Sequence, residues 1–342
     1  MTKPQRVDHA DSVGLADPTD ERSNCGVGVV VDLDGGANHR VVADGLQLLE
    51  NLEHRGTTGA EENTGDGAGI MIQRPDAFFA GVVDVDLPET YAVGSIFLPN
   101  DDDVAERVRT AFESSLVDHG LDVLAWRDVP TDADAADLGK TALDSEPDVW
   151  QVFVAPDDDL DTEAFDRALY VGRRAAEKAI DALDDDAADR FYVCSLSRET
   201  LVYKGLLKAE QLPAYYPDLA DERVASTLAL VHARFSTNTL GAWHLAHPYR
   251  NIIHNGEINT IRGNINWMRA RETDLESSAF GDDLETVKPV ITDPDQSDTA
   301  SVDEAVELLL QGGRSLPHVL RMLIPEAYRD DGLMDEARKE WY

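Results

Sequence analysis

Cysteine is almost absent from this 342-residue sequence, which contains only Cys25 and Cys194. So few cysteines exclude a disulfide framework, a four-cysteine zinc site and an iron–sulfur cluster held by this chain alone. Long apolar runs are absent as well. The longest, such as Val27–Val31, have the length of a strand, which excludes a transmembrane helix. The first 24 residues are polar and lack the apolar core of a secretory signal, so we expect a cytoplasmic protein.

Basic residues are scarce relative to acidic ones. Asp and Glu total 67 against 30 Lys and Arg, of which seven are lysines, and the net charge is −37. Such an acidic excess repels phosphate groups, so we expect binding neither to nucleic acid nor to an anionic membrane surface. Self-repulsion of this size destabilises a compact state unless salt screens it. The combination of many acids and few lysines favours a halophilic protein over an ordinary acidic one.

Hydrophobic residues make up 42% of the chain, enough for a sizeable core. Their periodicity predicts strands at 25–33, 70–73, 91–98, 121–127, 150–155, 191–197, 201–203, 225–235 and 249–254. It predicts helices at 40–52, 103–119, 162–183, 257–271, 299–311 and 316–323. These elements do not follow a regular βαβ order, which favours a layered α+β or sandwich fold. Residues 1–24 show no periodicity and are predicted to be a leader.

Cys25 opens an apolar strand directly after this leader. A thiol attacks only as a thiolate, and no His–Asp pair stands nearby in the sequence to activate it. If residues 1–24 were removed, Cys25 would carry a free α-amino group, whose pKa of about 7.7–8.0 suits a general base. Nucleophile and base would then share one residue. The alternative is a buried structural cysteine, which is the role we predict for Cys194, in the middle of a strand.

The segment HNGEIN, residues 254–259, stands between a predicted strand and a predicted helix. Acyl transfer requires hydrogen-bond donors directed at a developing oxyanion. Asn255 offers a side-chain amide and Gly256 a backbone N–H that a substrate can approach closely. The alternative is an ordinary Asn–Gly turn.

Three charged residues are candidates for holding a substrate. Arg234 ends an apolar strand, and its guanidinium suits a substrate carboxylate, although a surface salt bridge is the commoner role. Asp298 could pair with a substrate ammonium or act as a helix N-cap. Arg55 lies in an HRG turn, where it could line the same pocket or brace the loop.

Two other kinds of site are not supported by the sequence. The glycines of 65–69 match neither a dinucleotide-binding motif nor a P-loop, and they lead into a strand rather than a helix. His232, His244, His247 and His254 lie near one another in the sequence, but their spacing fits no standard ligand pattern. We therefore predict no metal site.

Several longer strings occur together in a fixed order: NCGVGVVVD, LEHRGTTGAEENTGDGAGIMIQRPDAFF, HARFSTNT, HNGEINTIRGN and SDTASVDEAVELLL. In this combination, over most of residues 24–328, the chain resembles the glutaminase domain of class II glutamine amidotransferases. More narrowly, it resembles the amino-terminal domain of the glutamate synthase large subunit. The acidic middle, from about 100 to 190, is less distinctive.

The resemblance implies an N-terminal-nucleophile hydrolase, an α+β fold with four layers in the order αββα. It implies that Cys25 becomes the first residue and attacks the amide carbon of L-glutamine, with Asn255 and Gly256 forming the oxyanion hole. It assigns Arg234 to the substrate carboxylate and Asp298 to the substrate ammonium. Arg55 corresponds to a pocket residue near the nucleophile.

The resemblance also implies a larger enzyme, in which ammonia passes to a synthase domain or subunit that acts on 2-oxoglutarate. FMN and an iron–sulfur cluster are expected only in that synthase part, and no cofactor is expected in this chain. The expected organisation is a leader at 1–24, the amidotransferase domain at 25–328 and the start of a truncated following helix or linker at 329–342. With its leader in place the chain is predicted to be inactive. The alternatives are a non-catalytic partner module with the same fold, or a glutaminase serving another ammonia acceptor.

Overall fold

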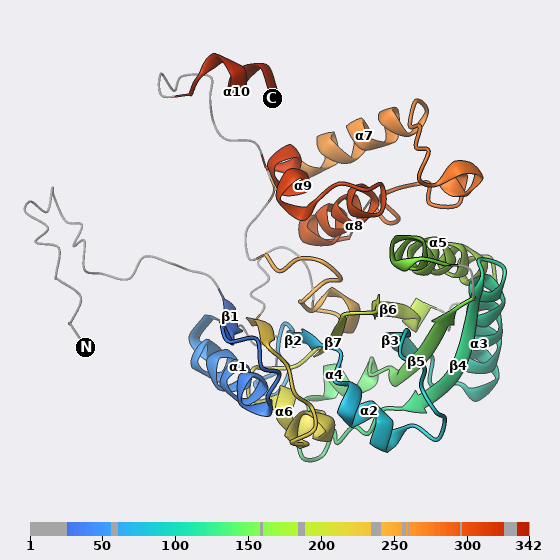
Figure 1. Ribbon diagram of the computed structural model, residues 1–342. Coiled ribbons are helices and arrows are strands. Elements are labelled where there is room, and N and C mark those ends of the chain that lie inside the picture. The colour runs from blue at the N-terminus through green and yellow to red at the C-terminus, as the bar shows by residue number, and fades with distance from the viewer. Residues whose placement is uncertain are drawn as a thin grey trace, which may run out of the picture.

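A computed structural model describes residues 26–55, 61–157, 160–183, 189–233, 241–254, 258, 260–294, 296–324 and 334–341, without the side chains of residues 55 and 341. These residues form an α+β fold with two antiparallel four-stranded sheets; helices cover the sheets, and the last described helix lies apart from both (Figure 1). The predicted α+β class is therefore confirmed.

The first sheet has the strand order β1-β8-β2-β7, so β1 and β7 are its edges. Its strands are β1 (Val27–Val31), β2 (Ala68–Gln73), β7 (Thr200–Gly205) and β8 (Leu228–Ala233). Val27 of β1 lies opposite His232, and Ala68 of β2 lies opposite Ala233. Because both pairings are antiparallel, the starts of β1 and β2 flank the end of β8.

The second sheet has the order β4-β5-β3-β6. Its strands are β3 (Ala92–Leu98), β4 (Leu121–Asp128), β5 (Asp148–Pro156) and β6 (Tyr192–Ser197). Every residue of β3 is buried, as expected for a central strand covered on both faces. The registers of β3 with β6 and of β4 with β5 each shift once, which marks bulges in two of the three strand pairs.

Ten α-helices occur in the described residues: α1 (His39–Asn51), α2 (Asp76–Val82), α3 (Asp102–Val117), α4 (Lys140–Asp144), α5 (Thr162–Asp181), α6 (Gln211–Tyr215), α7 (Ile261–Glu272), α8 (Asp298–Gln311), α9 (Leu316–Leu323) and α10 (Glu336–Trp341). Some of the many acidic residues cap the N-termini of helices. The side chains of Asp101 and Asp161 accept the N–H groups of Val104 and Ala164, which caps α3 and α5. None of the described helices is both long enough and apolar enough to cross a membrane.

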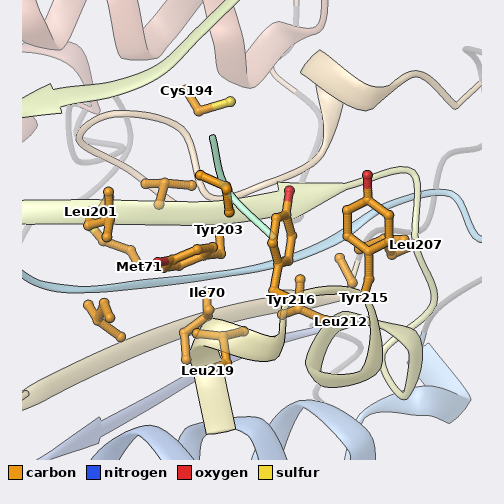
Figure 2. Close-up of a cluster of buried hydrophobic side chains, with 14 of the residues drawn as sticks. Ile70, Met71, Cys194, Leu201, Tyr203, Leu207, Leu212, Tyr215, Tyr216 and Leu219 are labelled. Carbon is orange, nitrogen blue, oxygen red and sulfur yellow. The ribbon is translucent and has the colours of Figure 1, made fainter. Parts of the chain in front are cut away.

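The buried apolar residues form three clusters. The largest combines α1 with residues of both sheets, including Met71 and Tyr203 of the first and Cys194 of the second (Figure 2). The second cluster lies between the second sheet and helices α3 and α5. The third joins residues of α5, α7 and α8 with the segment between the latter two. Side chains of the second sheet therefore enter two separate clusters, one shared with the first sheet and one with α3 and α5.

The sequence prediction was wrong at residues 249–254, where a strand was expected. No strand forms there, because the N–H groups of Asn251 and Ile252 donate to the side chain of Asp303 instead of to a neighbouring strand. The helix expected from residue 257 begins only at Ile261, after Thr260, which has a left-handed backbone with φ of 62°. The short helices α2, α4 and α6 were not predicted.

Candidate functional site

The residue before β1 and the last residue of β8 are hydrogen-bonded, and each adjoins a predicted site position in the sequence. The N–H of Ala233 donates to the carbonyl of Gly26 over 2.8 Å. Cys25 directly precedes Gly26 in the sequence, and Arg234 directly follows Ala233. Both candidates lie outside the described residues, so the structure fixes their neighbours rather than their side chains.

Two glycines allow the close packing of backbones at this end of the sheet. A Cβ atom on Gly26 would lie 2.2 Å from the carbonyl oxygen of Ala233. A Cβ atom on Gly69 would lie 2.3 Å from the carbonyl oxygen of His247. Real Cβ atoms do not approach backbone oxygens so closely, so any side chain at either position would push the strands apart. Gly26 thereby keeps the residue before β1 against the end of β8, and Gly69 keeps β2 against the segment around His247.

A row of buried aromatic rings leads from the strand ends to α8. The imidazoles of His232 on β8 and His247 stack with a centroid distance of 4.1 Å and an interplanar angle of 17°. His247 then meets the ring of Tyr249 at 4.5 Å. The hydroxyl of Tyr249 hydrogen-bonds the hydroxyl of Ser297, the N-cap of α8, over 2.7 Å. The end of β8 and the start of α8 are therefore connected through side-chain contacts.

A buried lysine holds the same segment from the other side. Lys204 of β7 is 1% exposed, and its ammonium donates to the carbonyl of His244 over 2.9 Å. The ammonium also lies 4.7 Å from the ring centre of Tyr192 and 4.8 Å from that of Tyr249. Aromatic faces offset part of the cost of removing a cation from water. This lysine fixes the chain between residues 244 and 249 against the first sheet.

Asp298 is the one candidate whose side chain the structure describes. It is the first residue of α8, and Ser297 caps the helix by accepting the N–H of Ala300 over 3.2 Å. The N-cap alternative for Asp298 is therefore wrong. Instead, the Asp298 carboxylate accepts the N–H of Ile258 over 2.8 Å. Asp298 thus contacts the chain directly after residues 255–257.

The remaining candidates cannot be placed as side chains. Asn255 and Gly256 lie outside the described residues. Arg55 ends the short 3₁₀ helix Glu53–Arg55, but its side chain is not described. The described part of the chain contains no group of three or more His, Cys, Asp or Glu residues arranged to hold a metal ion.

The structure reveals functional candidates that the sequence analysis missed. Asp303, on α8, is fully buried and accepts the N–H groups of Asn251 and Ile252 over 2.8 and 3.1 Å. Burial raises the pKa of Asp303, and the guanidinium of Arg250 opposes that rise. One sequence pattern could have pointed to Asp303. Asp303 is acidic, as is residue 307 one helical turn later, and both lie in a helix whose other residues are largely apolar.

Comparison with known proteins places this geometry in context. The sequence signature of the family described as Glutamine amidotransferases class-II matches residues 25–342. The chain is 43% identical to the glutamate synthase (NADPH) large chain of Bacillus subtilis, over 96% of this chain and 21% of that protein. It is 41% identical to the corresponding large chain of Azospirillum brasilense, over 91% of this chain and 20% of that protein.

A plant relative shows the same pattern. Identity to the ferredoxin-dependent glutamate synthase 2 of Arabidopsis thaliana chloroplasts is 40%, over 92% of this chain and 19% of that protein. The chain therefore spans about a fifth of the length of these relatives.

Proposed function

Because this chain belongs to the class II glutamine amidotransferases, an enzyme family, we propose that it hydrolyses L-glutamine to glutamate and ammonia through Cys25. The observation that supports this most is a chain of contacts between residues that adjoin three of the site positions in the sequence. Gly26 and Ala233, which adjoin Cys25 and Arg234, are hydrogen-bonded to each other. The row of rings from His232 through Tyr249 connects this pair to Ser297 and to the neighbouring Asp298, the proposed ammonium ligand.

The proposed reaction has two halves. The thiolate of Cys25 attacks the amide carbon of glutamine, and the α-amino group of Cys25 takes the thiol proton. Asn255 and the N–H of Gly256 stabilise the resulting oxyanion. When the tetrahedral intermediate collapses, the carbon–nitrogen bond breaks and the nitrogen leaves as ammonia with that proton. Water then attacks the γ-glutamyl thioester, which releases glutamate and restores the thiol.

The substrate's own charges define the remaining roles. Arg234 binds the α-carboxylate through its planar guanidinium, and Asp298 binds the α-ammonium. A carboxylate has about four lone-pair positions, so Asp298 can accept the N–H of Ile258 and a ligand ammonium together. Arg55 lines the pocket beside the nucleophile. An amino acid with both charges in place is thereby selected over a simple amide.

Activity requires removal of residues 1–24 in this proposal. While Asn24 is joined to Cys25, the nitrogen of Cys25 belongs to an amide and cannot act as a base. The uncut chain is then an inactive precursor. We further propose the four-layer αββα arrangement and a cytoplasmic location. Two of the apolar clusters, which place α1 against the first sheet and α3 and α5 against the second, support the layered arrangement.

The relatives suggest where the ammonia goes. They are glutamate synthases, and this chain covers about a fifth of their length. We propose that the chain is the glutaminase domain of such an enzyme and that its ammonia passes to a synthase domain or subunit using 2-oxoglutarate. FMN and an iron–sulfur cluster would belong to that part.

The test combines the mature N-terminus with an ammonia assay. Protein purified in high salt is analysed by intact mass, and ammonia release from glutamine is measured for the cut and the uncut chain. We expect release only from protein that begins at Cys25. A chain that begins at Cys25, is folded and releases no ammonia from glutamine would instead be a non-catalytic partner module.

A further inference from the structure

Helix α8 contacts the chain on both sides of residues 255–257. On the upstream side, Ser297 bonds the hydroxyl of Tyr249 over 2.7 Å, and Asp303 accepts the N–H groups of Asn251 and Ile252. On the downstream side, Asp298 accepts the N–H of Ile258 over 2.8 Å. One helix therefore bonds the chain at residues 249–252 and at residue 258, which precede and follow the proposed oxyanion donors in the sequence.

Asp303 is the central contact on the upstream side. Its carboxylate is fully buried, and a buried charge is costly unless partners replace the lost water. Two backbone N–H groups bind its Oδ1, and the guanidinium of Arg250, whose Nε lies 3.7 Å from Oδ2, offsets the charge without a hydrogen bond to that oxygen. Since residues 249–254 form no strand, Asp303 supplies the acceptor that a neighbouring strand would otherwise provide.

Helix α8 is itself held by a network of buried charges. Arg250 donates to Glu307 of α8 over 3.2 Å and to the carbonyl of Val193 on β6 over 3.1 Å. Arg173 of α5 donates to the same Glu307 over 2.6 Å. Arg173 also pairs with Glu177, one turn further along α5. The network connects α8 to the second sheet and to α5, so Asp303 projects from a fixed support.

We propose that Asp303 is a positioning residue for the carbonyl-oxygen site of glutamine hydrolysis. By holding the backbone at residues 251–252, Asp303 would determine the positions of Asn255 and Gly256, which follow a few residues later. Donors that are held in place before the reaction stabilise an oxyanion without reorganisation, and small displacements are costly. This inference rests on the proposed function, and it adds a residue that never touches the substrate.

The kinetic test compares substitutions at Asp303 with a control on the same helix. Asp303→Ala removes the acceptor, and we expect kcat for glutamine hydrolysis to fall about 100-fold with KM unchanged within about threefold. Glu304→Gln is the matched control, because Glu304 is also buried on α8 but accepts hydrogen bonds from Thr292 and Gln296. We expect the control to keep kcat within about threefold. Equal kcat values for the two folded variants would overturn the proposal.

Two conservative variants keep the test decisive if Asp303→Ala does not fold. Asp303→Asn keeps an oxygen at the same distance but loses the charge, whereas Asp303→Glu keeps the charge and displaces the oxygen by one methylene. Positioning predicts that the asparagine variant is the faster of the two. A purely ionic role, in which Asp303 only neutralises Arg250, predicts the reverse order and would refute positioning.

A readout independent of catalysis separates this inference from the proposed function. Amide hydrogen exchange of peptides covering residues 249–258 should become about tenfold faster or more in Asp303→Ala and Asp303→Glu, but not in Glu304→Gln. Unchanged exchange at 253–258 would refute the inference even if the wild-type protein releases ammonia. Wild-type protein that begins at Cys25 and releases no ammonia would overturn the proposed function and, with it, this role for Asp303.

Discussion

The two cysteines of this protein stand next to, or within, strands of different sheets, and the structure describes only the second of them. Cys25 directly precedes Gly26 and β1, at an edge of the first sheet. Cys194 lies within β6 of the second sheet, fully buried among apolar side chains of both sheets (Figure 2). Burial raises the pKa of the Cys194 thiol to about 11, although Lys204 opposes the rise. The same chemical group is thus proposed to be reactive at Cys25, where a free α-amino group would activate it, and inert at Cys194, where burial keeps it protonated.

A network of buried polar side chains crosses the interface between the sheets. The guanidinium of Arg127 on β4 binds both carboxylate oxygens of Asp218 at 2.7 and 2.8 Å and also donates to Gln151 of β5. Tyr203 of β7 donates to Asp218 over 3.1 Å and accepts from Gln151 over the same distance. This network joins the first sheet to the second. Substitutions in it therefore test the stability of the fold without changing a residue of the proposed site.

The largest expected effect distinguishes the two cysteines by activity. Cys25→Ser should lower glutamine hydrolysis by about 10³-fold or more, because a serine hydroxyl is a far weaker nucleophile than the thiolate. Cys194→Ala should retain activity within about twofold per folded molecule, since the proposed mechanism makes no use of Cys194. Ammonia release measured on both variants checks the difference. Comparable losses of activity in the two variants would mean that the two cysteines do not differ in function.

The next effect concerns the joint between the sheets. Asp218→Ala leaves the buried guanidinium of Arg127 without its carboxylate, and we expect the free energy of unfolding to fall by about 3–5 kcal/mol. Denaturant unfolding in high salt measures the change. Asp221→Ala is the control, because Asp221 pairs with the half-exposed Arg223, where water screens the charges, and its loss should lower the free energy of unfolding far less. Similar losses in both variants would show that the buried network does not hold the sheets together.

The third expected effect comes from the ionisation of the buried Cys194 thiol, which makes the stability of the fold depend on pH. The folded protein keeps the Cys194 proton up to a pH of about 11, whereas the unfolded chain releases it near 9.0. The thiol therefore stabilises the fold fully below pH 9 and loses this contribution as the pH rises towards 11. Alkylation of the Cys25→Ser variant at pH 8 should be at least about tenfold slower when folded than in denaturant. Equally fast labelling of the folded protein would mean that Cys194 is accessible.

The smallest effect concerns salt. Residues 101–190, which contain α3, β4, β5 and α5, carry 26 acidic and nine basic residues. Because salt screens their mutual repulsion, 2 M KCl should raise Tm by about 5 °C or more relative to low salt. Amide exchange should slow more in α3 and α5 than in α1. A neutral osmolyte at equal osmolality is the control, and an equal gain with it would mean that charge screening is not the cause.

The sequence alone predicted most regular elements because their signals are local. The expected boundaries of α9, Leu316–Leu323, match the structure, since Pro317 and an amphipathic pattern mark its start and its length. The fully buried strand β3 was also found, one residue shorter than expected. Short helices such as α2, with seven residues, carry too little periodicity to be recognised.

The errors and omissions arise from tertiary contacts. Residues 249–254 have the apolar content of a strand, but Asp303, some fifty positions later, takes the N–H groups that a strand would use. No local pattern contains that information. Of the predicted site, only the side-chain contacts of Asp298 are described, and the functional roles of all six residues remain predictions: Cys25, Arg55, Arg234, Asn255, Gly256 and Asp298.

The covalent intermediate gives the most direct test of the central claim. Protein that begins at Cys25 is mixed with glutamine, quenched in acid within one turnover and digested, and the cysteine peptides are examined by mass spectrometry. We predict a γ-glutamyl group on the sulfur of Cys25, none on Cys194, and none at either position in Cys25→Ser. Ammonia release without any adduct on Cys25, or with the adduct on another residue, would contradict the account.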